Sequence, residues 1–208
     1  MMTAQQHVRA PGLSISDSEP ECALCGRPPV DPVTGLGDRW TWAQRAPALL
    51  AQTFRQGRSA ALLVIDVDNF KQVNDRFGHS AGDMVLAAIA DAVCQATRPA
   101  DLVCRAGSGA DEFLVLMAAD ARIATGVAGG IRLGVDRLAL DCLTHGGTNV
   151  ITGLSVSCGY AVCDLATLAE RDELPTLEQL ALAADDALLR AKAAGVPGAA
   201  WPFYWGQR

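Results

Sequence analysis

The stretch that decides the fold is residues 60–71, Ala-Ala-Leu-Leu-Val-Ile-Asp-Val-Asp-Asn-Phe-Lys. Its apolar run from Ala60 to Val67, broken only by Asp66, predicts a buried β-strand. A second apolar run follows the acidic segment Ala110-Asp111-Glu112-Phe113. Mg²⁺ takes oxygen ligands and usually binds through one or two carboxylates plus substrate phosphates. Two carboxylate clusters at neighbouring strand ends therefore predict a site for a metal and a nucleotide triphosphate.

Composition limits the class of protein. The 208 residues are 50% hydrophobic and 19% charged, which is typical of a globular domain. A net charge of -6 without basic runs argues against nucleic-acid or anionic-membrane partners. No apolar stretch has the length of a membrane span, residues 1–20 lack the core of a signal peptide, and the odd number of cysteines reads as reduced thiols. We therefore expect a cytoplasmic protein.

Three regions are expected along the chain. Residues 1–30 are rich in Pro, Ser, Gln and Gly and predict a flexible leader. Residues 31–200 form the domain, and the aromatic tail 201–208 packs onto the domain or a partner surface. Cys22 and Cys25 have the spacing of half a zinc knuckle, which a second copy or His7 would have to complete. A reduced leader is the favoured interpretation, because no second close cysteine pair follows.

Hydrophobic periodicity predicts the elements of the domain. Helices are expected over residues 40–56, 80–97, 121–138 and 177–194, and strands over 60–67, 102–105, 113–117 and 154–162. Residues 106–110, Ala-Gly-Ser-Gly-Ala, have the composition of a hairpin turn, and Ser80 is the expected cap of the second helix. This alternation predicts an α/β (α+β) fold in which helices cover a mixed sheet.

The residues after Asp66 suggest a nucleotide site. We interpret this segment, which includes Lys71, as a turn whose exposed backbone amides hold metal and phosphate together. Asn74 and Asp83 follow and offer an amide and a carboxylate. These groups suit the edge of guanine, whose ring N–H and amino group need an acceptor.

The segment Asp66-Val67-Asp68-Asn69-Phe70-Lys71-Gln72-Val73-Asn74-Asp75, with Gly78-His79 and Gly82-Asp83, closely resembles the GGDEF-type diguanylate cyclases. Residues 31–36 with Arg39, residues 157–161 and residues 184–195 are similar to the opening segment, a late strand and the closing helix of that family. Together these matches cover the domain in the expected order. The resemblance implies a palm-like fold, as in nucleotidyl cyclases and polymerases, with a mixed, mainly antiparallel sheet.

The resemblance also implies an activity. Two protomers of a homodimer each hold one GTP, and the two nucleotides condense to cyclic di-GMP and pyrophosphate with Mg²⁺ or Mn²⁺. By position in the family motif, the metal ligands are Asp66, Val67 through its carbonyl, Asp111 and Glu112. The last two are also the catalytic residues, either of which helps to deprotonate the attacking hydroxyl. The implied substrate-binding residues are Asn69, Phe70, Lys71, Asn74, Asp83 and Lys192. Arg98 and Asp101 match the site at which cyclic di-GMP inhibits the family.

Two departures from the family pattern leave a second interpretation open. The signature hairpin, Gly-Ser-Gly-Ala-Asp-Glu-Phe over residues 107–113, is two residues longer than in the family, and Ala110 replaces its second glycine. Val196 stands where the family usually has a basic residue that contacts phosphate. Such a lost contact costs about 1.5 to 3 kcal/mol. The alternative is a catalytically degenerate domain that binds GTP or cyclic di-GMP as a sensor.

Overall fold

The computed structural model describes residues 30–106, 111–144, 147–166, 168, 173–195 and 198–205. Its elements, in chain order, are α1 (Arg39–Arg55), β1 (Ala60–Val67), α2 (Phe70–Phe77), α3 (His79–Ala96), β2 (Leu102–Cys104), β3 (Glu112–Met117), α4 (Ala121–Asp136), β4 (Leu140–Thr144), β5 (Gly147–Ile151), β6 (Val156–Cys163), α5 (Leu177–Ala193) and β7 (Ala200–Tyr204). The predicted zinc half-site, the leader and hairpin residues 107–110 lie outside the described residues.

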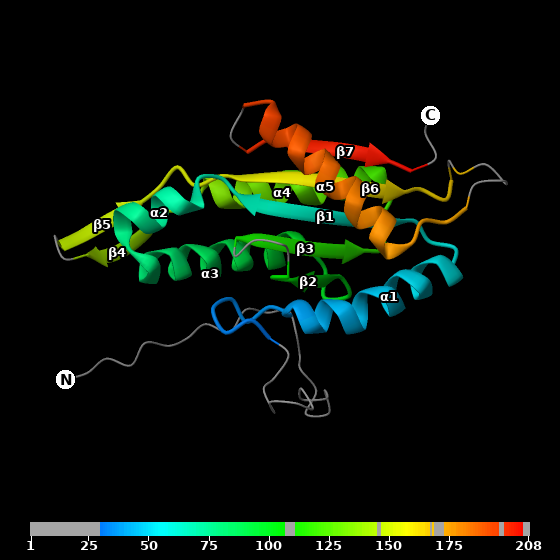
Figure 1. The fold of residues 1–208 in the computed structure, drawn as a ribbon, viewed down its shortest axis with the longest axis horizontal. Coiled ribbons are helices and arrows are strands. Elements are labelled where there is room, and N and C mark those ends of the chain that lie inside the picture. The colour runs from blue at the N-terminus through cyan, green and yellow to red at the C-terminus, as the bar shows by residue number, and fades with distance from the viewer. Residues whose placement is uncertain are drawn as a thin grey trace.

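A five-stranded sheet in the order β2-β3-β1-β6-β7 organises the domain. β1 is antiparallel to β3 on one side and to β6 on the other, whereas β7 pairs with β6 in parallel. β4 and β5 form a separate two-stranded hairpin that extends beyond one end of the main sheet (Figure 1). The predicted mixed, mainly antiparallel sheet is confirmed.

Helices cover both faces of this sheet. Ala61, Leu63 and Ile65 of β1 pack into a core shared with α3 and α4. Leu62 and Val64 point the other way, into a core shared with α1 and α5, and Figure 1 shows α5 crossing β6 and β1 with α4 behind them. Every residue of β1 is buried, because a strand covered on both faces has no solvent side. That arrangement explains its unbroken apolar sequence.

The predicted helices and strands are present with ends shifted by one or two residues, but four elements were missed. α2 has only eight residues and a largely polar sequence, so it read as a turn. β4 and β5 lack the apolar alternation of a half-buried strand, and β7 falls in the segment that read as an aromatic tail. The Ser80 cap was wrong: Gly78 is the N-cap of α3, with a φ of 88° that favours glycine.

No helix in the part of the chain that the structure describes is both long enough and apolar enough to cross a membrane.

Gly159 sets the distance between α5 and the sheet. A Cβ atom at this position of β6 would overlap with the amide nitrogen of Leu188 and the carbonyl oxygen of Ala184, both in the α5 backbone. Backbone atoms cannot swing aside as a flexible side chain can. Only glycine therefore lets α5 lie this close to β6, and the end of α5 carries Lys192.

We expect Gly159→Ala to lower the free energy of unfolding by about 1 to 3 kcal/mol, because the added methyl group overpacks a contact between backbones. Urea unfolding measures the change. Gly126→Ala is the matched control, since this α4 glycine has open space around the new methyl group and alanine favours a helix by about 0.5 to 1 kcal/mol. Equal stability of the two variants would contradict the role given to Gly159.

Candidate active site

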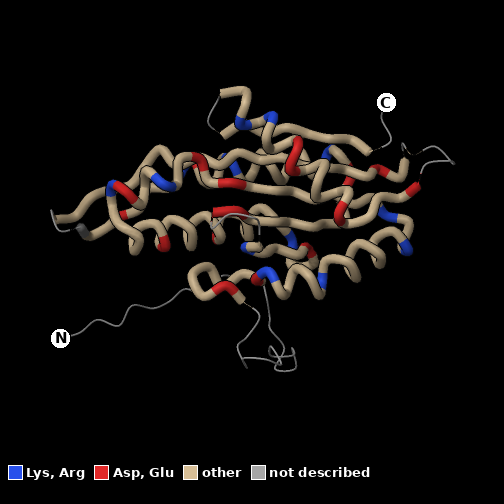
Figure 2. Tube along the Cα trace, in the orientation of Figure 1, with Lys and Arg blue, Asp and Glu red and all other residues tan. Residues whose placement is uncertain are grey.

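The two acidic segments meet where β1 ends and β3 begins. Asp66 is paired in register with Glu112 of β3 on one side and with Ser157 of β6 on the other. Directly paired residues share a sheet face, so both carboxylates lie on the face that α5 covers. The Val67 amide donates to the Asp111 carbonyl oxygen at 3.3 Å, which holds Asp111 beside the same strand end. Figure 2 shows the acidic positions side by side there.

Lys192 brings a positive charge to these acids. α5 begins with a capping box in which Thr176 and Gln179 exchange side-chain and backbone hydrogen bonds, and Lys192 lies in its last turn. Its Nζ is 2.8 Å from Oδ1 of Asp66. The lysine side chain is 42% exposed and the aspartate side chain 12%. The ammonium group thus reaches a largely buried carboxylate while staying in contact with solvent.

Burial and neighbouring charge perturb the acids of this site. Burial raises the pKa of Asp66, the Lys192 ammonium opposes that shift, and the charges of Asp111 and Glu112 add to it, so that the pKa lies above its ordinary value. Asp185 of α5 has a raised pKa for similar reasons, burial first and the charge of Glu112 second. Sequence reasoning gave Asp185 no role in the site, because only packing of α5 on the sheet brings it near Glu112.

The oxygen ligands described at this strand end suit Mg²⁺ or Mn²⁺ bound jointly with nucleotide phosphates, and they do not form a site that holds a metal by protein side chains alone. Within the described ranges, no three Asp, Glu, His or Cys side chains lie close enough to hold a metal by themselves. Mg²⁺ rarely needs such a cage, because it is commonly bound by one or two carboxylates and the phosphates of a nucleotide. The carboxylate of Asp66, with Asp111 and Glu112 near it, supplies ligands of that hard, anionic kind.

Asp68 has a structural task that the sequence did not reveal. Its carboxylate accepts hydrogen bonds from the Ser155 hydroxyl at 2.6 Å, the Ser157 hydroxyl at 2.7 Å and the Gly198 amide at 2.8 Å. We call Asp68, Ser155, Ser157 and Gly198 the Asp68 cluster. It joins the end of β1 to the start of β6 and to the segment before β7. Asp68 is therefore committed to internal hydrogen bonds.

Five of the six expected substrate-binding residues lie in or next to α2 and α3, and the sixth is Lys192 of α5. Asn69 has a left-handed backbone with a φ of 57° and its side chain does not cap α2. Phe70, Lys71 and Asn74 follow on that helix. Gly82 of α3 lies against both Asn74 and Phe70, since a Cβ there would overlap with Asn74 Oδ1. Asn74 thus contacts α3 at Gly82, and the next residue of α3 is the exposed Asp83. The structure therefore brings the two expected guanine-binding residues to one corner of the domain.

Arg98 and Asp101 form a tight turn between α3 and β2. The Arg98 amide donates to Oδ2 of Asp101 at 2.8 Å, and the Asp101 amide donates back to the Arg98 carbonyl at 2.9 Å. Burial raises the pKa of Asp101, while the hydrogen bond from the Arg98 amide and the charges of Arg98 and Arg58 oppose the rise. All three residues line a pocket of about 400 Å³ beside α1. Arg58, between α1 and β1, was not expected in this site.

The opening segment of the domain is tied to the base of the signature hairpin. Nη1 of Arg105, which follows β2, is 2.9 Å from both carboxylate oxygens of Asp31. Asp31 also accepts from the amide and hydroxyl of Thr34. Burial acts to raise the pKa of Asp31, but the bonds from Thr34 and Arg105 outweigh it and lower the pKa. Residues 31–36 thereby fix the chain just before residues 107–110.

Comparisons with known proteins agree with this architecture. A family model described as "Diguanylate cyclase, GGDEF domain" matches residues 29–196. Diguanylate cyclase DgcS of Shewanella oneidensis is 33% identical over 165 residues, which are 79% of this chain and 50% of DgcS. The structure of diguanylate cyclase SiaD of Pseudomonas aeruginosa, in complex with its activator SiaC, is 32% identical with a TM-score of 0.70, covering 84% of this chain and 61% of that one. A microbial GGDEF domain studied for its interaction with cyclic di-GMP is 28% identical with a TM-score of 0.66, covering 84% and 96%.

The mixed sheet, the acidic residues at its strand ends and the helix α5 above them are the arrangement of a GGDEF domain. The chain belongs to the GGDEF domain family, and the resemblance read from its motifs is confirmed. It spans about half the length of DgcS and 22% of the length of a second relative, diguanylate cyclase DgcP of Pseudomonas aeruginosa.

We expect Asp66→Asn to be more stable than the unaltered protein at pH 7 in the absence of metal. A raised pKa means that the folded state binds this proton more tightly than the unfolded chain, so the ionised carboxylate costs stability. The advantage of asparagine should shrink as pH falls through the folded pKa and vanish below the unfolded value, near 3.8.

Thermal unfolding in EDTA between pH 4 and pH 8 measures this dependence. Asp141→Asn, at an exposed position of β4, is the control and should show no such advantage. An Asp66→Asn protein that is less stable than the unaltered chain at pH 7 would rule out a net cost of the buried charge.

Proposed function

We propose that this chain is a diguanylate cyclase domain that condenses two GTP molecules into cyclic di-GMP and pyrophosphate across a homodimer. The observation that carries the proposal is the convergence of Asp66, Glu112 and Lys192 on one strand end, next to the corner formed by α2 and α3. Acids, a cation and a candidate base-binding pair are the groups that transfer of a nucleotidyl group requires. Family membership supports the same activity.

In the proposed reaction, the 3′-hydroxyl of each GTP attacks the α-phosphate of the other. Two new P–O bonds form, the two α-phosphate bonds to the β-phosphates break, and two pyrophosphates leave. Asp111 and Glu112 lie at the strand end where the hydroxyl proton must be accepted. Lys192, whose side chain is partly exposed beside Asp66, neutralises phosphate charge together with Lys71. Asn74 and Asp83 bind the guanine edge, and Phe70 and Asn69 shape the start of α2 around the phosphates.

We assign a divalent metal, Mg²⁺ or Mn²⁺, to the strand end that carries Asp66, the Val67 carbonyl, Asp111 and Glu112, where one or two of these carboxylates and the substrate phosphates would hold it. When bound, the metal supplies charge neutralisation at the attacking and leaving oxygens. The raised pKa of Asp66 supports this assignment, because crowded carboxylates gain from a nearby cation. Without metal, the ion pair between Lys192 Nζ and Asp66 Oδ1 keeps this carboxylate oriented.

A second candidate function is binding of cyclic di-GMP without turnover. The longer hairpin with Ala110 and the absence of a basic residue at Val196 favour it. The pocket at Arg98 and Asp101 supports it too, since Arg58, Arg98 and Asp101 all line a space of about 400 Å³. A carboxylate and an arginine together match the donor and acceptor edges of guanine. Both functions are compatible in one protein if the product also inhibits.

We expect purified protein with GTP and Mg²⁺ or Mn²⁺ to form cyclic di-GMP and pyrophosphate, quantified by chromatography. Asp66→Ala should lower the rate by about 100-fold or more, because it removes a charge that acts on the transition state. Asp141→Ala, an exposed acid away from the site, is the control. A folded, dimeric sample that forms no product would contradict the cyclase proposal and favour binding of cyclic di-GMP without turnover.

A further prediction concerns binding of cyclic di-GMP by Arg98 and Arg58. Isothermal titration with cyclic di-GMP should show that Arg98→Ala and Arg58→Ala each weaken binding by about tenfold or more, the loss of one charge-assisted hydrogen bond. Arg55→Ala is the control, because this exposed residue at the end of α1 does not line the pocket. Unchanged affinity in Arg98→Ala would place the ligand elsewhere.

A further inference from the structure

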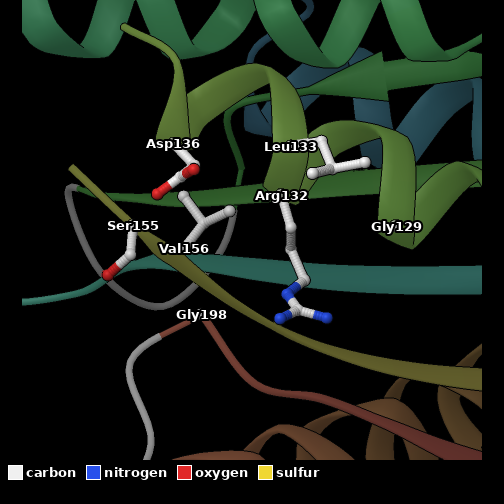
Figure 3. Close-up of a pocket in the computed structure, with 7 residues that line it drawn as sticks. All are labelled: Gly129, Arg132, Leu133, Asp136, Ser155, Val156 and Gly198. Carbon is white, nitrogen blue, oxygen red and sulfur yellow. The ribbon is translucent and has the colours of Figure 1, made fainter. Parts of the chain in front are cut away.

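A second pocket lies between α4 and the Asp68 cluster, and its lining includes none of the residues proposed to bind nucleotide or metal. Its volume is about 410 Å³, and it is lined by Gly129, Arg132, Leu133, Asp136, Ser155, Val156 and Gly198. Four of these residues come from α4. The others come from the start of β6 and the segment before β7. Figure 3 shows the Arg132 side chain extending from α4 toward Gly198, with the Asp136 carboxylate and Ser155 on the other side.

Arg132 supplies an unused donor at this pocket. Its Nε is buried and has no hydrogen-bond partner among the described residues. A buried donor without an acceptor is rare in native proteins and unfavourable unless something binds it. Glycine at position 198 leaves room beside the guanidinium, since even a Cβ there would be 3.8 Å from Nε. The planar guanidinium is suited to bidentate hydrogen bonds with an oxyanion.

The other polar groups of the pocket define what else a ligand would carry. The Ser155 hydroxyl and Gly198 amide already donate to Asp68, so Arg132 is the donor that remains. Asp136, at the opposite side (Figure 3), repels an anion but accepts a hydrogen bond from a hydroxyl or amino group. A ligand with an anionic group at one end and a hydroxyl or amino donor at the other could therefore bind both Arg132 and Asp136.

We propose that this pocket binds a small metabolite through a phosphate or carboxylate group held by Arg132. Its lining contains none of the residues assigned to GTP or cyclic di-GMP. Its occupant would contact Ser155 and Gly198, which both hold Asp68 two residues after Asp66. Binding therefore acts directly on the Asp68 cluster, which joins the end of β1 to the C-terminal segment.

The first test is titration of the ¹⁵N-labelled full chain with inorganic phosphate, and separately with acetate, at ionic strength matched with NaCl. The Nε–Hε resonance of Arg132 and the amide resonances of Ser155 and Gly198 should shift and saturate. Saturation with phosphate alone assigns a phosphate group, and saturation with acetate alone assigns a carboxylate. Arg132→Gln should weaken binding at least tenfold, whereas Arg122→Gln, at an exposed position of the same helix, should leave it unchanged.

A second pair of variants keeps every polar group and removes only the space. Gly129 lines the pocket, and a Cβ atom added to it meets nothing within 4 Å, so Gly129→Leu places an apolar side chain at the cavity without a clash at its Cβ. It should abolish the saturable shifts. Gly126→Leu, one turn earlier with equally open surroundings, should preserve them. Saturation that persists in Gly129→Leu or in folded Arg132→Gln, or the lack of any saturable shift at Arg132, would overturn the proposal.

Discussion

The position of β1 between β3 and β6 is the constraint on which the site depends. All eight of its residues are buried, and its register places Asp66 between Glu112 and Ser157. A slip of one residue would turn every side chain to the opposite face, moving Asp66 from α5 toward the core shared with α3. The apolar packing of alternate β1 residues against two helical layers resists such a slip, so the hydrophobic core also fixes the position of the acid.

Two further contacts complete the site from the C-terminal half of the chain. Gly159 lets α5 lie directly on β6, and this brings Lys192 to Asp66 and Asp185 toward Glu112. Asp68 then binds the segment that leads into β7. The acids and their cation are thus held by elements more than a hundred residues apart. The carboxylates of Asp66, Asp111 and Glu112 repel one another, and the packing around them keeps them close in spite of this repulsion, as is common at functional sites.

The proposed inhibitory pocket and the signature hairpin are joined by a short path. β2 consists of only three residues, Leu102–Cys104, between the turn at Asp101 and the guanidinium of Arg105. Arg105 is in turn held by Asp31, and the Arg105 amide donates to the Gly37 carbonyl at 2.9 Å. A ligand bound at Asp101 would therefore lie at one end of a buried strand whose other end is held at the base of the hairpin.

The sequence by itself determined the main strands and long helices, since buried runs such as Ala60–Val67 and the periodicity of α5 are local patterns. It also placed Asp66, Asn74 and Asp83 in a family motif. Only the tertiary structure decided that Lys192 pairs with Asp66, that Arg58 lines the same pocket as Arg98, and that Asp68 accepts hydrogen bonds from Ser155, Ser157 and Gly198. The reason is that these residues lie far apart in the chain. α2 and β7 escaped prediction for the same reason: a polar eight-residue helix and an edge strand are stabilised by packing, and no local pattern records what they pack against.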